Sequence, residues 1–312
     1  MKKRILVVSS ANMDFVQSVE RVPDAGETVI ESRSYSYVPG GKGANSALAF
    51  ARLGADTVFC AKVGRDDNAR KLRKLYESEG IDIRFLSEDR ETPTGLASIL
   101  VEENGANRII VYPGANEKLC EHDVEDAFTC YPDGVFVQLE IPDSAVIAAA
   151  RFARENKIPL FVDAGPARED FPLEKLFGAE IISPNETECR ILTGITPDSV
   201  DNCLKACIRL ATITEAKHVV LKLGHRGSFV YDGKYYNIVP SHKVPVEDTT
   251  AAGDVFTAAL SYAYIQKGDI LESARFATLA AAICVSRKGA STSIPTLREV
   301  KAFAKTIRGP KA

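Results

Sequence analysis

Several features that would assign this chain to a particular class are missing from its sequence. No apolar run approaches the roughly 18 residues that a membrane-spanning helix needs, so no bilayer span is predicted. The apolar run near the N-terminus is short and leads into polar Asn12 and Asp14, which favours a buried first strand over a signal peptide. The 39 basic and 42 acidic residues are interspersed, which argues against nucleic-acid or membrane partners held by charge.

The cysteines also lack the patterns of a disulfide framework or a zinc site. Their number, seven, is odd, there is no C-x-x-C pair, and no His stands at metal-ligand spacing. Most of them lie within periodic segments, at positions 60, 120, 130, 189, 203, 207 and 284. We therefore expect reduced, buried thiols in a cytoplasmic protein.

What the chain does contain is an alternation of two kinds of segment. Runs that are apolar at nearly every position, as in parallel strands covered on both faces, occupy 4–9, 57–63, 135–139, 160–163, 180–183 and 218–223. Segments of helical period occupy 45–53, 69–79, 144–156, 186–193 and 200–216, and later 251–266, 271–286 and 297–307, with a loop at 287–295. This alternation predicts an α/β fold with three layers, α/β/α, and a mainly parallel central sheet.

Two stretches, 15–38 and 94–112, break this alternation. Their two-residue periodicity is typical of antiparallel strands with one exposed face, and a turn at Glu103-Asn104-Gly105 divides the second. We expect them to pair as a small sheet beside the binding edge, where it would act as a lid and offer a dimer surface. With no linker or repeat, the 312 residues are interpreted as a single domain, 1–312, carrying these two inserted segments.

The segment Pro39 to Asn45 holds three glycines in four positions before a helix expected to begin near Asn45. Glycines allow positive φ and a close approach of the backbone to a ligand, while Asn45 would cap the helix or face a polar ligand. A tight turn is the simpler alternative. The segment has neither Walker A nor G-x-G-x-x-G spacing, which weakens the case for an oxidoreductase.

A second segment, Asp248 to Asp254, leads directly into a predicted helix and carries the strongest chemical signal. Small residues at a helix N-terminus direct backbone N–H groups toward an anion such as a phosphoryl group in transfer. Asp254 in the first turn would be the base that takes a proton from a substrate hydroxyl. Ordinary helix capping is the alternative interpretation of this carboxylate.

Together these segments resemble the ribokinase-like carbohydrate kinases over nearly the whole chain. The resemblance rests on Asn12-Met13-Asp14, Pro23 to Thr28, Gly40 to Asn45, Asn107-Arg108, Pro113 to Asn116, Gln138-Leu139-Glu140, Asn185 to Glu188, Lys222 to Gly227, Asp248 to Asp254 and Arg287 to Ala290. It implies a central sheet flanked by helices, with a small β lid that mediates a homodimer. It also implies ATP-dependent phosphorylation of the 5-hydroxyl of D-ribose.

The resemblance further implies a role for individual residues at the sugar and the reaction centre. The sugar would be bound by Asn12, Asp14, Gly40, Gly41, Lys42, Asn45, Glu140 and Asp254. Asp254 would be the base, and the amides of Gly253, Ala252 and Ala251 would form the anion hole. From the residues alone, Asp14 could instead belong to a turn and Glu140 to a solvated strand end.

The nucleotide site and the cations follow from the same resemblance. ATP would contact Asn185, Lys222, Leu223, Gly224, His225, Arg226, Gly227, Gly253, Asp254 and Thr278, the last near the purine. Glu188 would act through water on Mg²⁺, and a K⁺ would lie beside Asp248, Thr250, Cys284, Arg287, Gly289 and Ser293. Open alternatives are a hairpin turn at Gly224 to Gly227, an exposed Glu188, and a Lys222 that points to solvent.

Other functions remain in competition at this stage. Within the family, 2-deoxyribose, fructose or a nucleoside could be the acceptor, although Asn12 beside Asp14 favours a sugar with the full hydroxyl set. A non-catalytic sugar sensor would not need Asp254. A dehydrogenase would need the missing glycine fingerprint.

Overall fold

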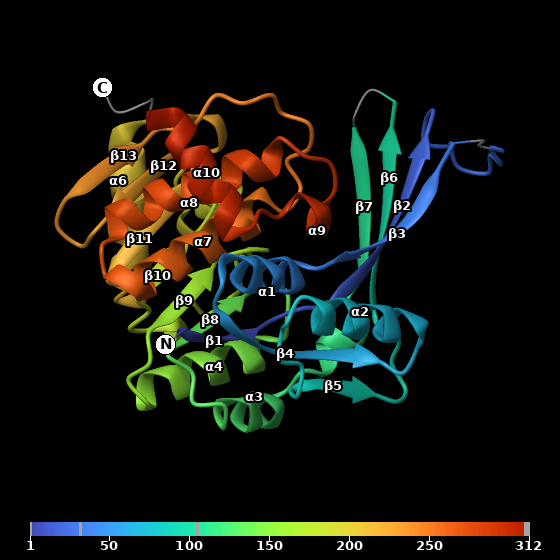
Figure 1. The fold of residues 1–312 in the computed structure, drawn as a ribbon, viewed down its shortest axis with the longest axis horizontal. Coiled ribbons are helices and arrows are strands. Elements are labelled where there is room, and N and C mark those ends of the chain that lie inside the picture. Colours follow the sequence, from blue (N-terminus) through green and yellow to red (C-terminus); the bar gives the residue numbers. More distant parts are fainter. Residues whose placement is uncertain (1, 31–32, 104–105, 309–312) are drawn as a thin grey trace.

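The computed structural model describes residues 2–30, 33–103 and 106–308, and its centre is a nine-stranded sheet. The strand order is β13-β12-β11-β10-β9-β8-β1-β4-β5 (Figure 1). The pairs from β11 through β5 are parallel, whereas β12 runs antiparallel to both β11 and β13. The strands are β1 Arg4–Val8, β4 Asp56–Gly64, β5 Leu86–Asp89, β8 Gly134–Gln138, β9 Leu160–Asp163, β10 Ile181–Ser183, β11 His218–Lys222, β12 Ser228–Tyr231 and β13 Tyr236–Val239.

Helices cover both faces of this sheet. They are α1 Lys42–Leu53, α2 Asp67–Ser78, α3 Glu121–Phe128, α4 Asp143–Glu155, α5 Glu186–Thr193, α6 Val200–Thr214, α7 Ala252–Lys267, α8 Ile270–Val285, α9 Ala290–Ser293 and α10 Leu297–Arg308. Short 3₁₀ turns, η1 Gly114–Lys118, η2 Leu173–Leu176 and η3 Gly224–Arg226, lie in the connections.

The two faces of the sheet form two separate cores. In β1, Ile5 and Val7 pack into the core shared with α1, α7 and α8. Leu6 and Val8 pack into the other core, with α3, α4 and α6. Because successive side chains of a strand point to opposite faces, a strand between two helical layers is apolar at nearly every position. The predicted three-layer α/β/α fold is therefore confirmed.

The two inserted segments pair as predicted and form a second, four-stranded sheet, which we call the lid (Figure 1). Its order is β3-β2-β6-β7, with β2 at Asn12–Val19, β3 at Tyr35–Gly40, β6 at Gly95–Glu102 and β7 at Asn107–Tyr112. Strand β2 pairs antiparallel with β3 and parallel with β6. The two inner strands of the lid are thus held on both edges. The predicted turn at 103–105 includes residues 104 and 105, which lie outside the described residues.

Several element boundaries differ from the prediction. Helix α1 begins at Lys42, three residues before Asn45, because Gly41 with φ 89° is the N-cap. The predicted loop 287–295 contains the short helix α9. Helix α3 and the edge strands β5 and β13 were missed, since they are short or only partly apolar. Cys120, at the start of α3, is exposed, while the other six thiols are buried as expected.

Candidate active site

A cavity of about 1110 Å³ lies where the lid meets the carboxyl ends of the central strands. In an open α/β sheet this edge is where ligands usually bind. Residues on its walls include Asn12, Asp14, Lys42, Asn45, Glu140, Asn185, Gly253 and Asp254, all predicted from the sequence. On the lid side its wall is apolar and comes from Ile99, Ile109 and Val111. The structure therefore gathers the predicted sugar and reaction residues around one space.

The glycine segment brings α1 close to the end of β1. A Cβ at Gly43 would lie 2.6 Å from the backbone N and O of Ser10, so only glycine allows this approach. Gly41 has positive φ, and a Cβ there would lie 2.9 Å from Asn12 N. The interpretation of Asn45 as a helix cap is wrong. Asn45 lies inside the first turn, and its Nδ2 donates a hydrogen bond to Asp254 Oδ2 at 2.8 Å.

Asp254 is buried in the first turn of α7 with its carboxylate toward the cavity. Gln138 Nε2 lies 3.4 Å from its Oδ1, and Lys42 Nζ lies 3.9 Å from the same oxygen. Burial raises the pKa of Asp254 to about 6, against the opposing effect of the Lys42 ammonium. Asp254 in turn raises the pKa of Lys42, which therefore remains charged. A carboxylate with a pKa nearer neutrality is better suited to accept a proton from a hydroxyl.

The start of α7 has the geometry expected of an anion site. Ala251, the N-cap, has φ 63°, a left-handed conformation that is uncommon for a residue with a side chain. The first helical hydrogen bond runs from Val255 N–H to Ala251 O at 2.9 Å, so the N–H groups of Gly253 and Asp254 precede the helical ladder. The Ala252 N–H instead donates to Thr249 O at 3.3 Å. Of the predicted amides, that of Gly253 is therefore better placed than that of Ala252 to meet an anion.

Asp14 and Glu140 lie on the sugar side of the cavity. Burial, followed by the charges of Glu140 and Asp254, raises the pKa of Asp14 to about 7. Glu140 accepts a short hydrogen bond from Ser10 Oγ and another from the Lys42 N–H at 3.0 Å. Glu140 is thus fixed against the glycine segment, which disfavours a freely solvated strand end. Asp14 belongs to strand β2 rather than to a turn.

Three buried residues at this edge were not identified from the sequence. Asn116 donates from Nδ2 to Asn12 Oδ1 at 2.6 Å and accepts the Ala11 N–H at 2.9 Å. Gln138 and Asp163 are the last residues of β8 and β9 and lie beneath Asp254. The sequence carried a signal for each of them. Gln138 and Asp163 are polar residues at the ends of buried strands, and Asn116 occurs in a recognised motif, and both features are typical of the ligand-binding edge of the sheet.

The predicted nucleotide residues follow β10 and β11. Asn185 caps α5, where its Oδ1 accepts the Glu188 N–H at 2.8 Å and Glu188 Oε2 accepts the Asn185 N–H at 2.7 Å. Glu188 is buried, so the exposed alternative is wrong. Lys222 does not point to solvent either, since its Nζ lies 2.5 Å from Asp163 Oδ1. Thr278 on α8 is buried and donates to Ala274 O at 2.8 Å.

The loop after Lys222 forms a tight turn that ends at β12. Gly224 and Gly227 have φ 53° and 90°, and a Cβ at Gly227 would collide with Val239 O. Arg226 donates to Pro197 O at 2.6 Å and pairs with Glu186 on α5. The hairpin interpretation is therefore correct for this loop. A turn of this kind also leaves its backbone able to pack against a ligand.

The predicted potassium residues come from the loop before α7 and from the region between the end of α8 and α9. The Asp248 carboxylate accepts the Thr250 N–H and the Gly289 N–H, each at 2.9 Å. Although partial burial opposes it, the hydrogen bond from the Thr250 hydroxyl together with these two bonds lowers the pKa of Asp248. Cys284 Sγ lies 3.1 Å from Ser293 Oγ and 3.7 Å from Thr250 O. A carboxylate beside backbone carbonyls is a donor set that suits a hard cation.

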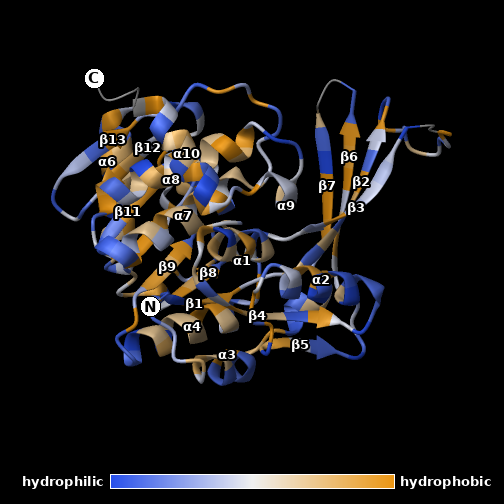
Figure 2. Ribbon diagram, viewed as in Figure 1, coloured by the Kyte–Doolittle hydropathy of each residue, from blue (hydrophilic) through white to orange (hydrophobic). Residues whose placement is uncertain are grey.

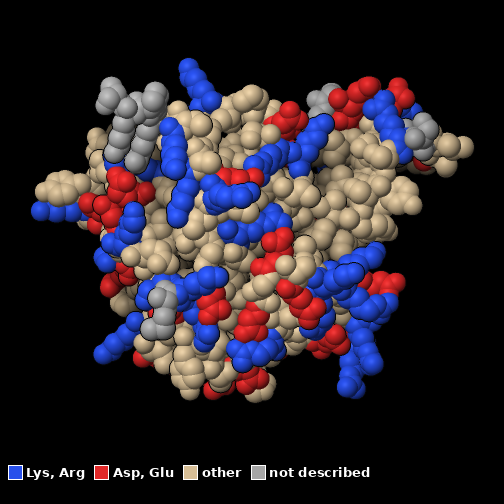
Figure 3. All heavy atoms as spheres, in the orientation of Figure 1, with Lys and Arg blue, Asp and Glu red and all other residues tan. Residues whose placement is uncertain are grey.

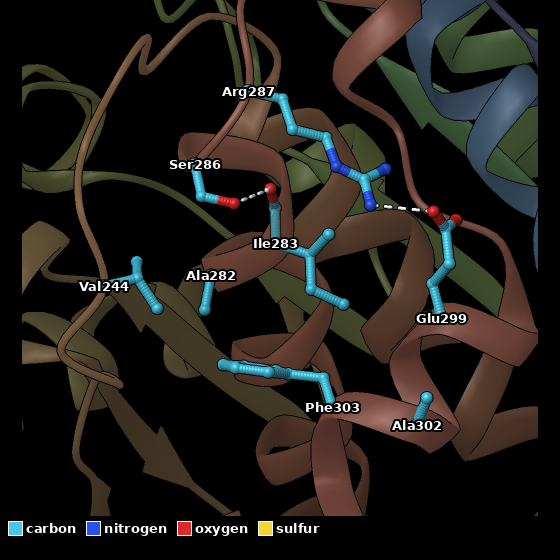
Figure 4. A pocket seen from close by; sticks show the side chains of 8 residues that line it. All are labelled: Val244, Ala282, Ile283, Ser286, Arg287, Glu299, Ala302 and Phe303. Carbon is cyan, nitrogen blue, oxygen red and sulfur yellow. Dashed lines mark hydrogen bonds and ion pairs between the residues drawn. The ribbon is translucent and has the colours of Figure 1, made fainter. Parts of the chain in front are cut away.

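The Arg287 side chain is directed away from these donors, toward a second cavity of about 310 Å³ between α8 and α10 (Figure 4). Its guanidinium donates to Glu299 at 2.7 Å at the rim of this mainly apolar cavity. Any contribution of Arg287 to a cation would therefore come from its backbone. Among the described residues, no group of three or more His, Cys, Asp or Glu side chains is arranged to hold a metal.

The geometry agrees with the comparison to known families. A family model described as pfkB family carbohydrate kinase matches residues 2–297. This chain belongs to that family. The match includes both the glycine segment and the start of α7, which are the two parts of the molecule that meet at Asp254.

Individual relatives narrow the comparison. A ribokinase of Haemophilus influenzae is 36% identical over 97% of this chain and 99% of its own length. A bifunctional ribokinase/ribose-5-phosphate isomerase A of Fructilactobacillus sanfranciscensis is 37% identical, and there the chain spans 55% of the relative. A deoxyribokinase of Salmonella typhi is 30% identical over 96% of the chain.

A solved structure gives the same fold. The Arabidopsis thaliana ribokinase complexed with ribose and ATP matches with a TM-score of 0.90 and 32% identity, covering 98% of this chain and 99% of that one. No helix among the described residues has both the length and the apolar character to cross a membrane. On the face shown in Figure 3, acidic and basic side chains are interspersed.

Proposed function

We propose that this kinase transfers the γ-phosphoryl group of ATP to the 5-hydroxyl of D-ribose. The observation that carries this proposal is the buried Asp254 at the start of α7, facing the same cavity as Asn12 and Asp14. A base, an anion site and a set of hydroxyl-binding groups thereby share one space. The ribokinase relatives, and the related structure described with ribose and ATP, support the choice of substrates.

In the proposed step, the 5-hydroxyl oxygen attacks the γ-phosphorus while its proton passes to the Asp254 carboxylate. The new bond joins this oxygen to phosphorus, and the bond between the γ-phosphorus and the β,γ-bridging oxygen breaks, so ADP leaves. Asn45, at 2.8 Å from Oδ2, orients the carboxylate for this transfer. The Gly253 amide and the positive end of α7 would stabilise the charge on the transferred group.

The remaining residues have binding roles in this proposal. Asn12, Asp14, Glu140 and the glycine segment hold the sugar. Asn185, Thr278 and the loop from Lys222 to Gly227 border the nucleotide. Mg²⁺, when bound with ATP, neutralises phosphate charge, and Glu188 is the buried carboxylate that would hold it through water. K⁺ would be held by the two loops that Asp248 joins and would fix the start of α7.

The lid would close over the sugar and also form a homodimer. Its inner face supplies apolar side chains to the cavity, and closure would exclude water that competes with the hydroxyl for ATP. Tyr35, Ile110 and Tyr112 on the lid are 70%, 75% and 54% exposed, and strands β6 and β7 of the lid are mostly hydrophobic (Figure 2). Exposed apolar patches of this kind mark association surfaces. Light scattering at several concentrations would test the dimer.

A second candidate acceptor is 2-deoxyribose, which the deoxyribokinase relative favours. The two are distinguished by a panel of pentoses, hexoses and nucleosides assayed for ATP-dependent phosphorylation. We expect the highest kcat/KM with D-ribose, because Asn12 and Asp14 present two polar side chains for adjacent hydroxyls. A higher kcat/KM with 2-deoxyribose, fructose or a nucleoside would reject ribose as the substrate.

The role of Asp254 is tested by Asp254→Asn. We expect kcat to fall by at least about 100-fold, the lower end for loss of a general base, while ribose and ATP still bind. Thermal shifts with each ligand would show that the site is intact. Turnover near that of the unmodified protein would remove the proposed role of Asp254 as the base, whereas a lack of ATP-dependent turnover in the unmodified protein would favour the sugar-sensing interpretation.

A further inference from the structure

A buried ion pair lies directly beneath the start of α7. It joins Lys222 at the end of β11 to Asp163 at the end of β9, with 2.5 Å between Nζ and Oδ1. Their side chains are only 11% and 3% exposed. Burying two charges costs free energy that the pair recovers only with good geometry and further hydrogen bonds, so such a pair is weak evidence for a purely stabilising role.

Lys222 connects this pair to the proposed anion site. Its Nζ donates to Thr257 Oγ1 at 3.2 Å, and Thr257 Oγ1 donates to Gly253 O at 3.1 Å. A Cβ built on Gly253 would lie 3.8 Å from the same Nζ. The ammonium is therefore packed against the first turn of α7 at the residue whose amide faces the transferred phosphoryl group.

Asp163 connects the pair to the proposed base. Its Oδ2 lies 3.4 Å from Gln138 Nε2, which also lies 3.4 Å from Asp254 Oδ1. Gln138 is held from its other end by Ser9 Oγ, at 3.1 Å from Oε1. One amide group thus lies between the carboxylate of the pair and the carboxylate of the base.

We propose that Lys222 and Asp163 form a positioning pair that holds the first turn of α7 and sets the electrostatic environment of Asp254. The two charges act on Asp254 in opposite directions: Asp163 raises its pKa and Lys222 lowers it. The pair therefore orients the base through Gln138 and Thr257. While both members are charged, their opposite effects on the pKa of Asp254 offset each other. Neither residue needs to touch the sugar in this role.

Other charged and titratable groups around Asp254 contribute to the same environment. They are Lys42 on α1, Asp14 on β2, Glu140 after β8, Glu188 on α5 and Cys284 on α8. None of these residues is itself substituted when only Lys222 or Asp163 is changed, although Glu188 Oε2, 4.0 Å from Lys222 Nζ, loses that charge partner in Lys222→Met. A comparison of those two substitutions with each other therefore isolates the effect of the pair.

The test uses Lys222→Met and Asp163→Asn, made singly and together, with kcat measured from pH 5 to 9 at saturating ribose and ATP. Removing the positive charge raises the pKa of Asp254, so the acidic limb in Lys222→Met should move to higher pH. Removing the negative charge should move it to lower pH in Asp163→Asn. We expect about one pH unit in each case, the lower end for a charge within a few ångströms of a carboxylate.

The double variant has neither charge of the Lys222–Asp163 pair, so neither member is left buried without the other, and it keeps the test valid if a single variant fails to fold. Its limb should lie between those of the single variants, with kcat reduced by about tenfold because the alignment is lost. The Lys62–Asp123 pair, at 2.7 Å with both side chains 14% exposed, provides a matched control on β4 and α3. Lys62→Met should lower thermal stability and leave the acidic limb in place.

The proposal rests on the proposed function, because it takes Asp254 as the base, but the two can fail separately. If Asp254→Asn keeps turnover, the mechanism itself is wrong. If Asp254→Asn is inactive but both single variants keep the acidic limb of the unmodified protein, only the positioning pair is rejected. The same conclusion follows if the double variant keeps both that limb and an unreduced kcat. Acidic limbs that move in the same direction in the two single variants also reject the positioning pair. A general structural defect would not shift the pKa of Asp254 in opposite directions in the two variants, whereas the loss of opposite charges should.

Discussion

The binding of ribose should depend on pH through Asp14. Burial and the charges of Glu140 and Asp254 raise the pKa of this carboxyl to about 7. In the proposed site its ionised form accepts hydrogen bonds from sugar hydroxyls. Protonation would remove an acceptor and weaken binding as the pH falls through 7. For the stability of the sugar-free protein, the raised pKa means that the contribution of Asp14 is lost as the pH rises through 7.

The size of the effect follows from the ionised fraction. With a pKa of about 7, roughly one tenth of the protein carries ionised Asp14 at pH 6 and roughly nine tenths at pH 8. Since the apparent Kd scales inversely with the competent fraction, it should fall by about tenfold between these two pH values. The release of up to about one proton per ribose should accompany binding at pH 6.

Isothermal titration calorimetry of ribose without ATP would measure both quantities. The Kd is recorded at pH 6, 7 and 8, and two buffers of different ionisation enthalpy at each pH count the protons released. Asp14→Asn is the matched control, because it keeps the shape and cannot titrate. It should bind ribose weakly and with little dependence on pH. A constant Kd from pH 6 to 8 in the unmodified protein, or an unchanged pH dependence in Asp14→Asn, would refute this account.

Two further predictions concern Asn116 and the proposed potassium site. Asn116→Asp removes the Nδ2 donor to Asn12, so KM for ribose should rise by about tenfold, the loss of one or two buried hydrogen bonds, while KM for ATP changes little in the same assay. An equal rise in both KM values would contradict this positioning role. Replacing K⁺ by Na⁺ or by a bulky organic cation should lower kcat, and Asp248→Asn should abolish the difference between the cations. Equal initial rates with all three cations in the unmodified protein would exclude a potassium site.

The fold could be predicted where burial imposes a regular pattern of apolar residues or where capping residues mark the ends of a helix. Strands such as β9, covered on both faces, are apolar up to the polar residue that ends them, and α5 matched the prediction at both ends because Asn185 and Gly194 cap it. Edge strand β5 has no such constraint, since one side of it faces solvent. Its sequence, Leu-Ser-Glu-Asp, carries little apolar signal.

The site was predictable to the extent that its residues occur in compact segments. Gly41 and Asp254 belong to such segments, and the structure brings them to one cavity. The partners of Asp254 were harder to foresee, because Gln138 and Asp163 meet it only through the parallel pairing of β8 and β9. Lys222 was ambiguous for the same reason. Its partner is 59 residues away in sequence, and periodicity within one segment cannot reveal a pair that spans two strands.

Strand β2 begins with Asn12 and Asp14 at the cavity and continues as an inner strand of the lid. Two of the residues proposed to hold the sugar are therefore in one continuous strand with the proposed association surface. Asn12 and Asp14 must move with the lid when it shifts relative to the nine-stranded sheet, because β2 is hydrogen-bonded on both edges, to β3 and β6. In a dimer held by the lid, a movement of β2 on sugar binding in one subunit would be passed directly to the lid of the other subunit. The expected result is cooperative binding of sugar.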